Sequence, residues 1–201
     1  MKTNKKNIRI VDCELYFLPL KTRVPLKFGH EVSTGYDTAK VKLTVENTDG
    51  KRAVGWGESP LSPAWAWPSE ESFASRLEKM RGYCRVLAAR WSRFAEIGHP
   101  MELGTAFLES ELQDPEFPEL ARLTCCAPFD LALHDAYGNL HGVDVYQTYN
   151  AEFMNRDLES YFSEKEFLGL YPEDFFVKPA QNLPVWHLVG GKDPLSSGEL
   201  A

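Results

Sequence analysis

The sequence predicts an α+β fold in which a three-stranded antiparallel meander packs against a helical bundle and is followed by an irregular C-terminal tail. Two observations lead to this expectation. Residues 37–47 alternate strictly, with Ala39, Val41, Leu43 and Val45 on one face and polar residues on the other. A sustained helical stripe of apolar residues follows the strand region. A sheet with one apolar face needs a helical layer to cover it, so the two patterns belong to one domain.

Each strand has its own signature. Residues 8–18 alternate with a one-residue slip before Cys13, as a β-bulge would allow. Residues 37–47 form the clearest strand, and Asp49-Gly50 after it indicates a tight turn. Residues 53–58 return as a third strand. Its two glycines, Gly55 and Gly57, suggest that another backbone or side chain approaches closely.

Three helices are expected after the strands. Ser69 is a suitable N-cap for the first, and Gly98 ends its pattern. Its apolar stripe recurs at alternating spacings of four and three: Phe73, Leu77, Met80, Cys84, Leu87, Trp91 and Phe94. A shorter helix is expected over residues 100–112. The third covers residues 127–141, with Pro128 in its first turn and Gly142 as its stop.

Composition limits the possible partners and location. The 201 residues carry a net charge of −7 without a basic stripe, so we expect no nucleic acid partner. No apolar run is long enough for a signal peptide or a membrane span, and we expect a cytoplasmic protein without membrane partners. None of the four cysteines forms a Cys-x-x-Cys pair, so all four are expected to be reduced thiols.

Two motifs resemble one protein family. The first reads Ala-Pro-Phe-Asp-Leu-Ala-Leu-His-Asp over residues 127–135, followed by Gly138 and then by Gly-Val-Asp-Val-Tyr over residues 142–146. The second is Gly-Trp-Gly-Glu over residues 55–58. Together they resemble the N-terminal capping domain of the enolase superfamily, in its mandelate racemase/muconate lactonizing enzyme group. The resemblance covers residues 8–149. The chain departs from the family pattern at Pro128, His134 and Asp144.

The resemblance implies a domain organisation and a parent reaction. Residues 1–149 would be the capping domain, 150–182 an irregular insertion or linker, and 183–201 the start of a barrel that this chain lacks beyond its first strand, expected over residues 183–189. In the family, the barrel abstracts a proton alpha to a carboxylate with the help of Mg²⁺, giving racemisation, dehydration or cycloisomerisation. This chain would hold no catalytic residue, no metal and no cofactor; Mg²⁺ is expected only in the full-length parent. The expected partners are a small carboxylate substrate, the barrel and a further copy in a homo-oligomer.

The resemblance also points to site residues. Two loops of the cap close over the barrel mouth in the family. Here the first would be residues 22–36, with Lys27, Phe28 and His30 as substrate-binding residues, and the second residues 59–68, with Trp65 and Trp67. Glu58 would lie at the interface with the barrel. The plainer interpretation makes the first loop an ordinary solvated connection, and has both tryptophans pack on the domain's own helices.

Other functions have less support in the sequence. Asp130 and His134 share a helix face, but two ligands do not make a metal site, and helix packing explains both. His187 near the expected barrel strand has no supporting partner. A stand-alone interaction module that uses its aromatic loop to bind another protein is the main alternative. A complete enzyme of unrelated mechanism would need a phosphate loop, a nucleophile elbow or a ligand cluster, and the sequence has none of these.

Overall fold

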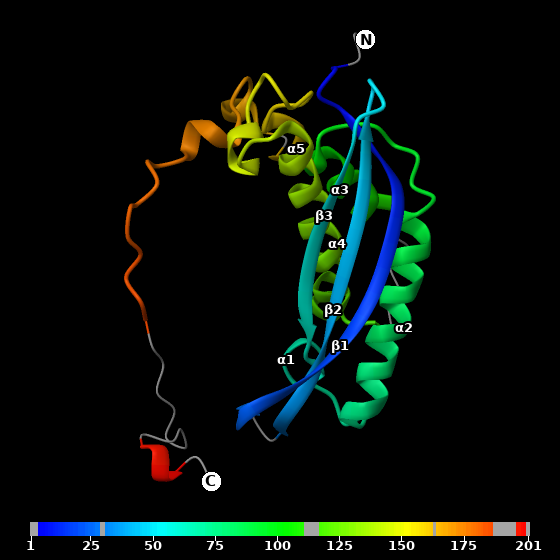
Figure 1. The fold of residues 1–201 in the computed structure, drawn as a ribbon, viewed down its shortest axis with the longest axis vertical. Coiled ribbons are helices and arrows are strands. Elements are labelled where there is room, and N and C mark those ends of the chain that lie inside the picture. The colour runs from blue at the N-terminus through cyan, green and yellow to red at the C-terminus, as the bar shows by residue number, and fades with distance from the viewer. Residues whose placement is uncertain (1–3, 29–30, 111–116, 163, 187–195, 200–201) are drawn as a thin grey trace.

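A computed structural model of the chain describes residues 4–28, 31–110, 117–162, 164–186 and 196–199. Three strands, β1 (Ile8–Phe28), β2 (Glu31–Asn47) and β3 (Arg52–Leu61), form an antiparallel sheet in the order β1-β2-β3 (Figure 1). The expected meander is therefore confirmed. Its register shifts between Ile10 and Asp12, which confirms the slip expected in the first strand. Gly50 adopts a φ of 79° in the tight turn between β2 and β3, where it donates to the carbonyl of Asn47.

The prediction of a first loop over residues 22–36 is wrong. Residues 22–36 belong mostly to a long β-hairpin, because β1 continues to Phe28 and β2 begins at Glu31. Lys27 pairs with Val32, and Phe28 pairs with Glu31. Pro25 lies in the second register irregularity of β1, between Lys21 and Leu26, where a missing N–H costs no ladder hydrogen bond.

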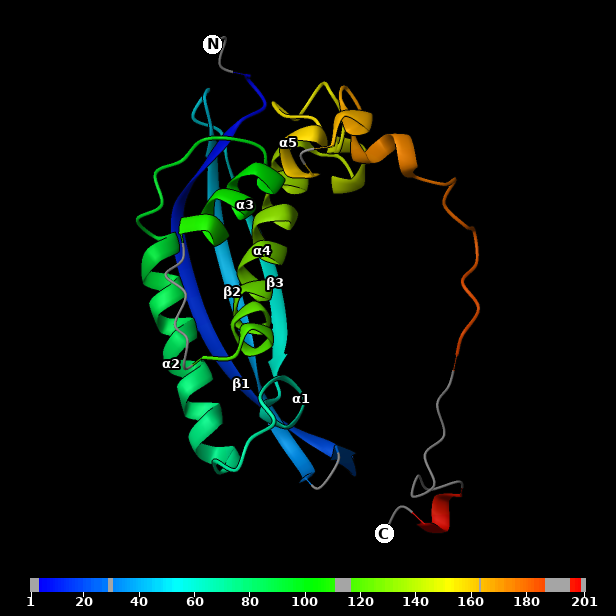
Figure 2. The same cartoon turned by 180° about the vertical axis from the view of Figure 1, so that it is seen from behind.

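The helices are α1 Pro63–Ala66, α2 Phe73–Trp91, α3 Pro100–Ser110, α4 Glu119–His141 and α5 Glu159–Phe162. The three longest, α2, α3 and α4, lie on one face of the sheet (Figure 2). Short 3-10 helices occupy Val145–Thr148, Lys165–Phe167, Pro172–Phe175 and Ser197–Glu199. Ser72, not Ser69, caps α2, because its side chain accepts from the N–H of Ser75. This helix ends at Trp91 rather than at Gly98.

Helix α4 is longer than expected and contains Pro128 in its interior. The good helix formers before Pro128 extend the helix back to Glu119, so this proline does not mark a first turn. Gly142 ends the helix in the left-handed conformation, with φ 71°, and its N–H donates to the carbonyl of Gly138. That stop is confirmed.

The core lies between the sheet and helices α2, α3 and α4. The strands contribute Ile8, Ala39, Val41, Leu43 and Val45, and the helices contribute Met80, Cys84, Leu87, Trp91, Phe107, Phe129, Leu133 and Leu140. Trp91 stacks on Phe107 with ring centroids 3.9 Å apart, which joins α2 to α3. The four cysteines are free thiols, and all except Cys13 are buried.

The segment after α4 packs on the domain before the chain leaves it. Phe153, Met154 and Leu158 are buried. From there the chain runs outward, and Val185 and Trp186 are 91% and 94% exposed. Residues 183–186 of the expected barrel strand form no strand, and residues 187–189 lie outside the described residues. Within the described ranges, no helix is both long and apolar enough to cross a membrane.

Candidate functional site

The contact between β3 and α4 holds the candidate site together, and the Gly-Trp-Gly-Glu motif makes it possible. A Cβ on Gly57 would lie 2.1 Å from the carbonyl oxygen of Pro128, and one on Gly55 would lie 2.1 Å from the backbone nitrogen of Ala136. Neither position has room for a side chain. The strand therefore lies directly on the helix backbone, which confirms the close approach expected from the two glycines.

Polar side chains of α4 bind the backbone of the strand at this contact. The N–H of Trp56 donates to Oδ2 of Asp135 at 2.8 Å, and Nδ2 of Asn139 donates to the carbonyl of Val54 at 3.0 Å. Strand β3 is an edge strand, so these side chains satisfy ladder groups that no fourth strand pairs within the described sheet. Asp135 thus has a structural role at this contact.

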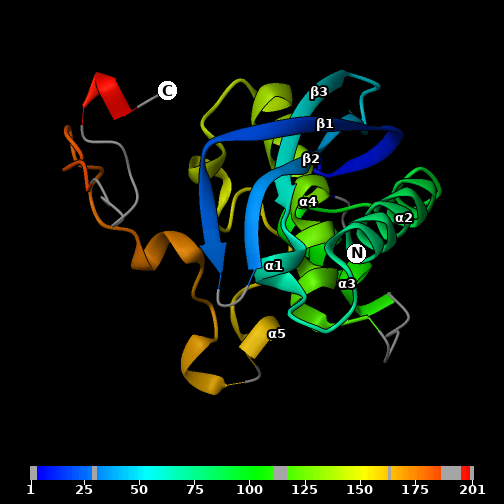
Figure 3. The ribbon, with the colours of Figure 1, turned by 90° about the horizontal axis from the view of Figure 1, so that it is seen from below.

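The hairpin tip, α1 and the first half of α4 meet at one end of the domain, seen end-on in Figure 3. A groove of about 500 Å³ lies between them. Its lining combines Leu26 and Tyr36 of the hairpin, Trp65 of α1, and Thr124 and Ala127 of α4, together with Ser59, Pro60 and Ser62. Lys27 is exposed beside Leu26 at the end of β1. Phe28 ends β1, but its side chain lies outside the described residues, as does all of His30.

The two tryptophans expected on the second loop differ in their surroundings. Trp65 is 54% exposed and lines the groove. Trp67 is only 8% exposed, and its ring centroid lies 4.8 Å from that of Phe117. The expected loop over residues 59–68 contains the end of β3 and the short helix α1. Only Trp65 therefore presents its ring at the surface, while Trp67 fixes the segment to the core.

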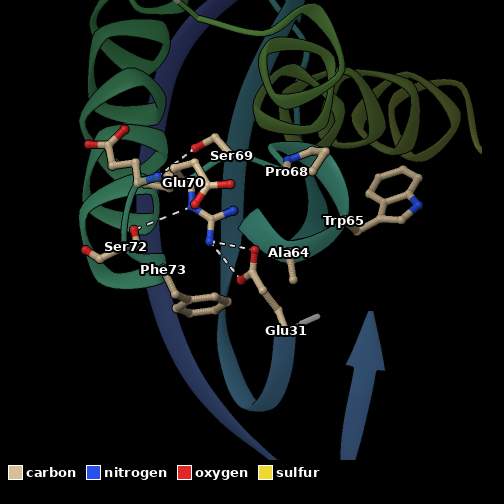
Figure 4. A pocket seen from close by; sticks show the side chains of 10 residues that line it. Glu31, Ala64, Trp65, Pro68, Ser69, Glu70, Ser72 and Phe73 are labelled. Atoms are coloured by element: carbon tan, nitrogen blue, oxygen red, sulfur yellow. Dashed lines mark hydrogen bonds and ion pairs between the residues drawn. The ribbon is translucent and has the colours of Figure 1, made fainter. Parts of the chain in front are cut away.

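A second pocket, of about 760 Å³, lies on the other side of α1 (Figure 4). Arg76 of α2 lies at the base of this pocket, and its side chain is 2% exposed. Its Nη2 lies 2.8 Å from each carboxylate oxygen of Glu31 at the start of β2. Its Nη1 donates to the carbonyls of Trp67 at 2.5 Å and Pro63 at 3.3 Å. In Figure 4, Glu31 faces the interior of the pocket. Trp65 belongs to the lining of this pocket as well as to that of the groove.

Glu58 lies in the sheet rather than at the end of a strand, because β3 continues to Leu61. Its carboxylate is exposed and lies 3.9 Å from Nζ of Lys40 on β2. With Trp56, Leu131 and His134, the two charged residues line a shallow hollow along the β3 edge. Glu58 is therefore available at the surface for a contact with another domain.

Helix α4 is apolar on two faces. One face lies in the core. On the other, Leu120, Leu123 and Leu131 are 44%, 40% and 52% exposed. At about 100° per residue, these leucines and Ala127 fall within one strip along the helix. This strip, which we call the outer strip of α4, begins beside the groove and runs along the helix. A contiguous exposed apolar strip of this kind often marks an interaction surface.

The opposite end of the domain contains a buried histidine cluster. Nε2 of His99 lies 3.2 Å from Oγ1 of Thr148, and Nδ1 of His134 lies 2.8 Å from the hydroxyl of Tyr149. Burial lowers the pKa of His99 to about 3, assisted by the nearby His134 and His141. Burial also lowers the pKa of His134. These imidazoles are therefore neutral packing groups at neutral pH.

Glu102 connects this end to the segment after α4. Its Oε1 accepts from the backbone N–H groups of Asn155 and Arg156, at 2.6 and 3.0 Å. Its Oε2 accepts from the N–H of His99 and from Nδ2 of Asn155, at 3.1 and 2.5 Å. One buried carboxylate thus meets four donors, which offsets its desolvation. Residues 155–156 are thereby fixed to the N-terminus of α3.

The described residues contain no cluster of three or more His, Cys, Asp or Glu side chains suited to a metal ion. Asp130 and His134 do lie close, with Oδ1 and Nε2 3.7 Å apart, but His134 uses its other nitrogen for Tyr149. His134 therefore packs α4 against the segment that follows it.

Sequence reasoning missed Arg76, Glu31 and Glu102. Arg76 falls on the buried side of α2 three residues after Phe73, and a cation within an apolar stripe signals a buried ion pair. Nothing in the sequence indicates that its partner is Glu31, 45 residues earlier. Glu102 lies in the first turn of α3, where an acid is expected at a helix N-terminus, but its long-range acceptor role leaves no local signal.

No family model and no curated protein matches the sequence. Among solved structures, the chain is similar to an enolase from Streptomyces coelicolor, with 21% identity and a TM-score of 0.41, over 65% of this chain and 28% of that one. It is also similar to the L-Ala-D/L-Glu epimerase from Bacillus subtilis, with 18% identity and a TM-score of 0.44, over 71% of this chain and 35% of that one. A third similar structure is a dipeptide epimerase from Enterococcus faecalis, with 16% identity and a TM-score of 0.43, over 71% of this chain and 35% of that one. The chain thus spans about a third of the length of these structures, which are enolase superfamily members.

Proposed function

We propose that the chain is the capping, substrate-specificity domain of an enzyme of the enolase superfamily that abstracts a proton alpha to a carboxylate. The proposal rests on the two sequence motifs and on the place of their residues in the fold. Gly55, Gly57 and Asp135 all act at the contact between β3 and α4. The motifs thus build the domain, and the exposed ends of its segments remain free for substrate.

The observation that carries the proposal is the groove. It brings the β1–β2 hairpin and the segment after β3, which are far apart in sequence, together at one end of the domain. Those are the two segments that close over substrate in the family that the motifs resemble. The groove is mostly apolar, and the exposed Trp65 belongs to its lining. An apolar cover suits a small carboxylate with an apolar side chain. Lys27, next to Leu26 in β1, would add a positive charge nearby.

The outer strip of α4 supports a partner domain next to the groove. Leu120, Leu123 and Leu131 would each lose exposed apolar area on contact with a barrel, which stabilises such a contact by about 25 cal/mol per Å². Leu183, Val185 and Trp186 of the tail are also highly exposed apolar residues. We propose that both surfaces belong to the same interface, with Glu58 at its edge.

In the parent enzyme, Mg²⁺ would stabilise the negative charge that develops on the substrate carboxylate. The present residues would have a different role. Trp65 would exclude water from the substrate, and Lys27 would attract the carboxylate by its charge. Trp67 would hold the α1 segment on the core. By these roles the cap would select the substrate, while the proton transfer would take place on the barrel.

The coding sequence downstream of Ala201 tests this proposal. We expect an open frame of several hundred residues with a Lys-x-Lys sequence and three spaced acidic residues, as the family's barrel requires. A stop codon directly after Ala201 would contradict the proposal. It would favour a stand-alone module that uses the groove and Trp65 to bind another protein.

A further inference from the structure

We infer that Arg76 is a positioning residue that joins the hairpin and the α1 segment into one unit. The contacts of Arg76 do not depend on the proposed function. Their relevance to substrate does, because these are the two segments proposed to cover it. Arg76 itself belongs to neither segment. It lies on the first turn of α2, and its guanidinium reaches both.

The hydrogen bonds of the guanidinium account for all of its N–H groups. Nε lies 3.5 Å from the carbonyl of Ser72, the N-cap of its own helix. Nη1 binds Pro63 and Trp67 at the two ends of α1, and Nη2 binds both oxygens of Glu31. A planar guanidinium has a fixed geometry. The positions of Glu31 and of the α1 carbonyls therefore depend on each other through one rigid group.

Because Arg76 is buried, a change in the hairpin or in the α1 segment should alter its hydrogen bonds to the other segment. Arg76 is 2% exposed, and Glu31 is 31% exposed. A buried cation that loses its anionic partner becomes unfavourable, so it moves toward water or draws in another acceptor. Movement toward water breaks the bonds from Nη1 to α1. A change at Glu31 should therefore reach Trp67 even though every hydrogen bond described for the Glu31 carboxylate goes to Arg76.

The arrangement has a consequence for substrate selection. Trp65 lies between Pro63 and Trp67, the two residues whose carbonyls bind Arg76. Lys27 lies opposite Val32, next to Glu31 on β2. The two proposed substrate contacts thus come from segments that share one anchor. Their positions are therefore coupled through Arg76.

Amide hydrogen exchange on the complete 201-residue chain tests this coupling. Glu31→Ala should speed exchange of the Ala66 and Trp67 amides by about tenfold, and Glu31→Gln, which keeps one acceptor, should speed it less. Glu78→Ala is the matched control, because Glu78 pairs with Arg81 and Arg85 on the exposed side of α2. The control should leave Ala66 and Trp67 unchanged. The amide of the buried Leu87 reports global unfolding and corrects each variant for it.

Two results would overturn the inference. In the first, Glu31→Ala changes exchange only near residues 31–33 and leaves Ala66 and Trp67 as they were. In the second, Glu78→Ala has the same effect as Glu31→Ala. Arg76→Lys gives a second measurement that does not depend on Glu31: it should speed exchange at Trp67 and at Ser33 together. No barrel takes part in any of these measurements, so a stop codon after Ala201 would end the capping proposal and leave this coupling intact.

Discussion

The N–H of Trp56 donates to the carboxylate of Asp135 across 2.8 Å, from the edge strand β3 to helix α4. The bond explains why an acid at this point of the helix motif accompanies a glycine on each side of Trp56. The glycines let the backbones of β3 and α4 approach closely, and the carboxylate of Asp135 accepts the hydrogen bond of an edge-strand N–H. The two motifs are therefore two sides of one contact.

Asp135→Ala should lower the free energy of unfolding by about 1 kcal/mol, because it removes a charged acceptor from an exposed strand N–H that water can partly replace. Asp130→Ala is the control on the same helix, since Asp130 is exposed and lies 3.7 Å from His134. Urea unfolding of both variants measures the difference. Equal effects at the two positions would argue against the role of the bond to Trp56.

Gly57→Ala should be strongly destabilising, by about 3 kcal/mol, because the new methyl would force β3 away from α4. Gly82→Ala is the matched control. Apart from its chain neighbours and the surrounding backbone of α2, no described atom lies within 4 Å of a Cβ built on Gly82 in the middle of that helix, so alanine there should stabilise the helix by up to about 1 kcal/mol. Thermal unfolding should move in opposite directions for the two variants. A Gly57→Ala protein with unchanged stability would contradict the close contact.

Trp67→Ala should cost about 3–5 kcal/mol, as expected for a large side chain lost from a core. Trp65→Ala should change stability by about 0.5 kcal/mol or less, because its ring is 54% exposed. Urea unfolding separates the two. If Trp65→Ala were the more destabilising change, the assignment of Trp65 to the surface and Trp67 to the core would be wrong.

Acid should destabilise the fold through His99. Its pKa is about 3 in the folded protein, against an ordinary histidine pKa of 6.5, so between these pH values the unfolded chain binds a proton that the folded chain does not. The stabilisation is complete above pH 6.5 and is lost as the pH falls toward 3. His134 and His141, whose pKa values are also lowered by burial, act in the same direction.

His99→Gln tests this contribution, because glutamine offers hydrogen-bonding groups but does not titrate in this range. Between pH 6 and 4, the wild-type free energy of unfolding should fall faster than that of the variant, by up to about 1.4 kcal/mol per pH unit. The measurement is urea unfolding at several pH values. Parallel curves for the two proteins would show that His99 does not carry the difference.

The sequence predicted the parts of the fold that local periodicity determines. Strict alternation placed β2, and the stripe beginning at Phe73 placed α2. It was less reliable where one residue type has two meanings. Pro25 looked like part of a loop but lies in a strand irregularity, and Pro128 looked like a helix start but lies inside α4. In both cases tertiary packing outweighs the local signal of proline.

The candidate site was only partly predictable for a related reason. The resemblance pointed to two segments, and the structure brings residues of both, Trp65 among them, into one groove. The ion pair of Arg76 with Glu31 joins residues 45 positions apart, so no local pattern reports it. Which of two neighbouring tryptophans enters the core depends on the partner ring of Phe117, which comes from a distant part of the chain.

Hydroxyl-radical side-chain oxidation tests the capping account most directly, by comparing this chain with the longer polypeptide that its downstream frame is expected to encode. We predict that joining the barrel protects Trp65, Leu123 and Leu131, while Val86, which is 52% exposed on α2, reacts equally in both. Unchanged oxidation of all three residues in the longer polypeptide would contradict the account.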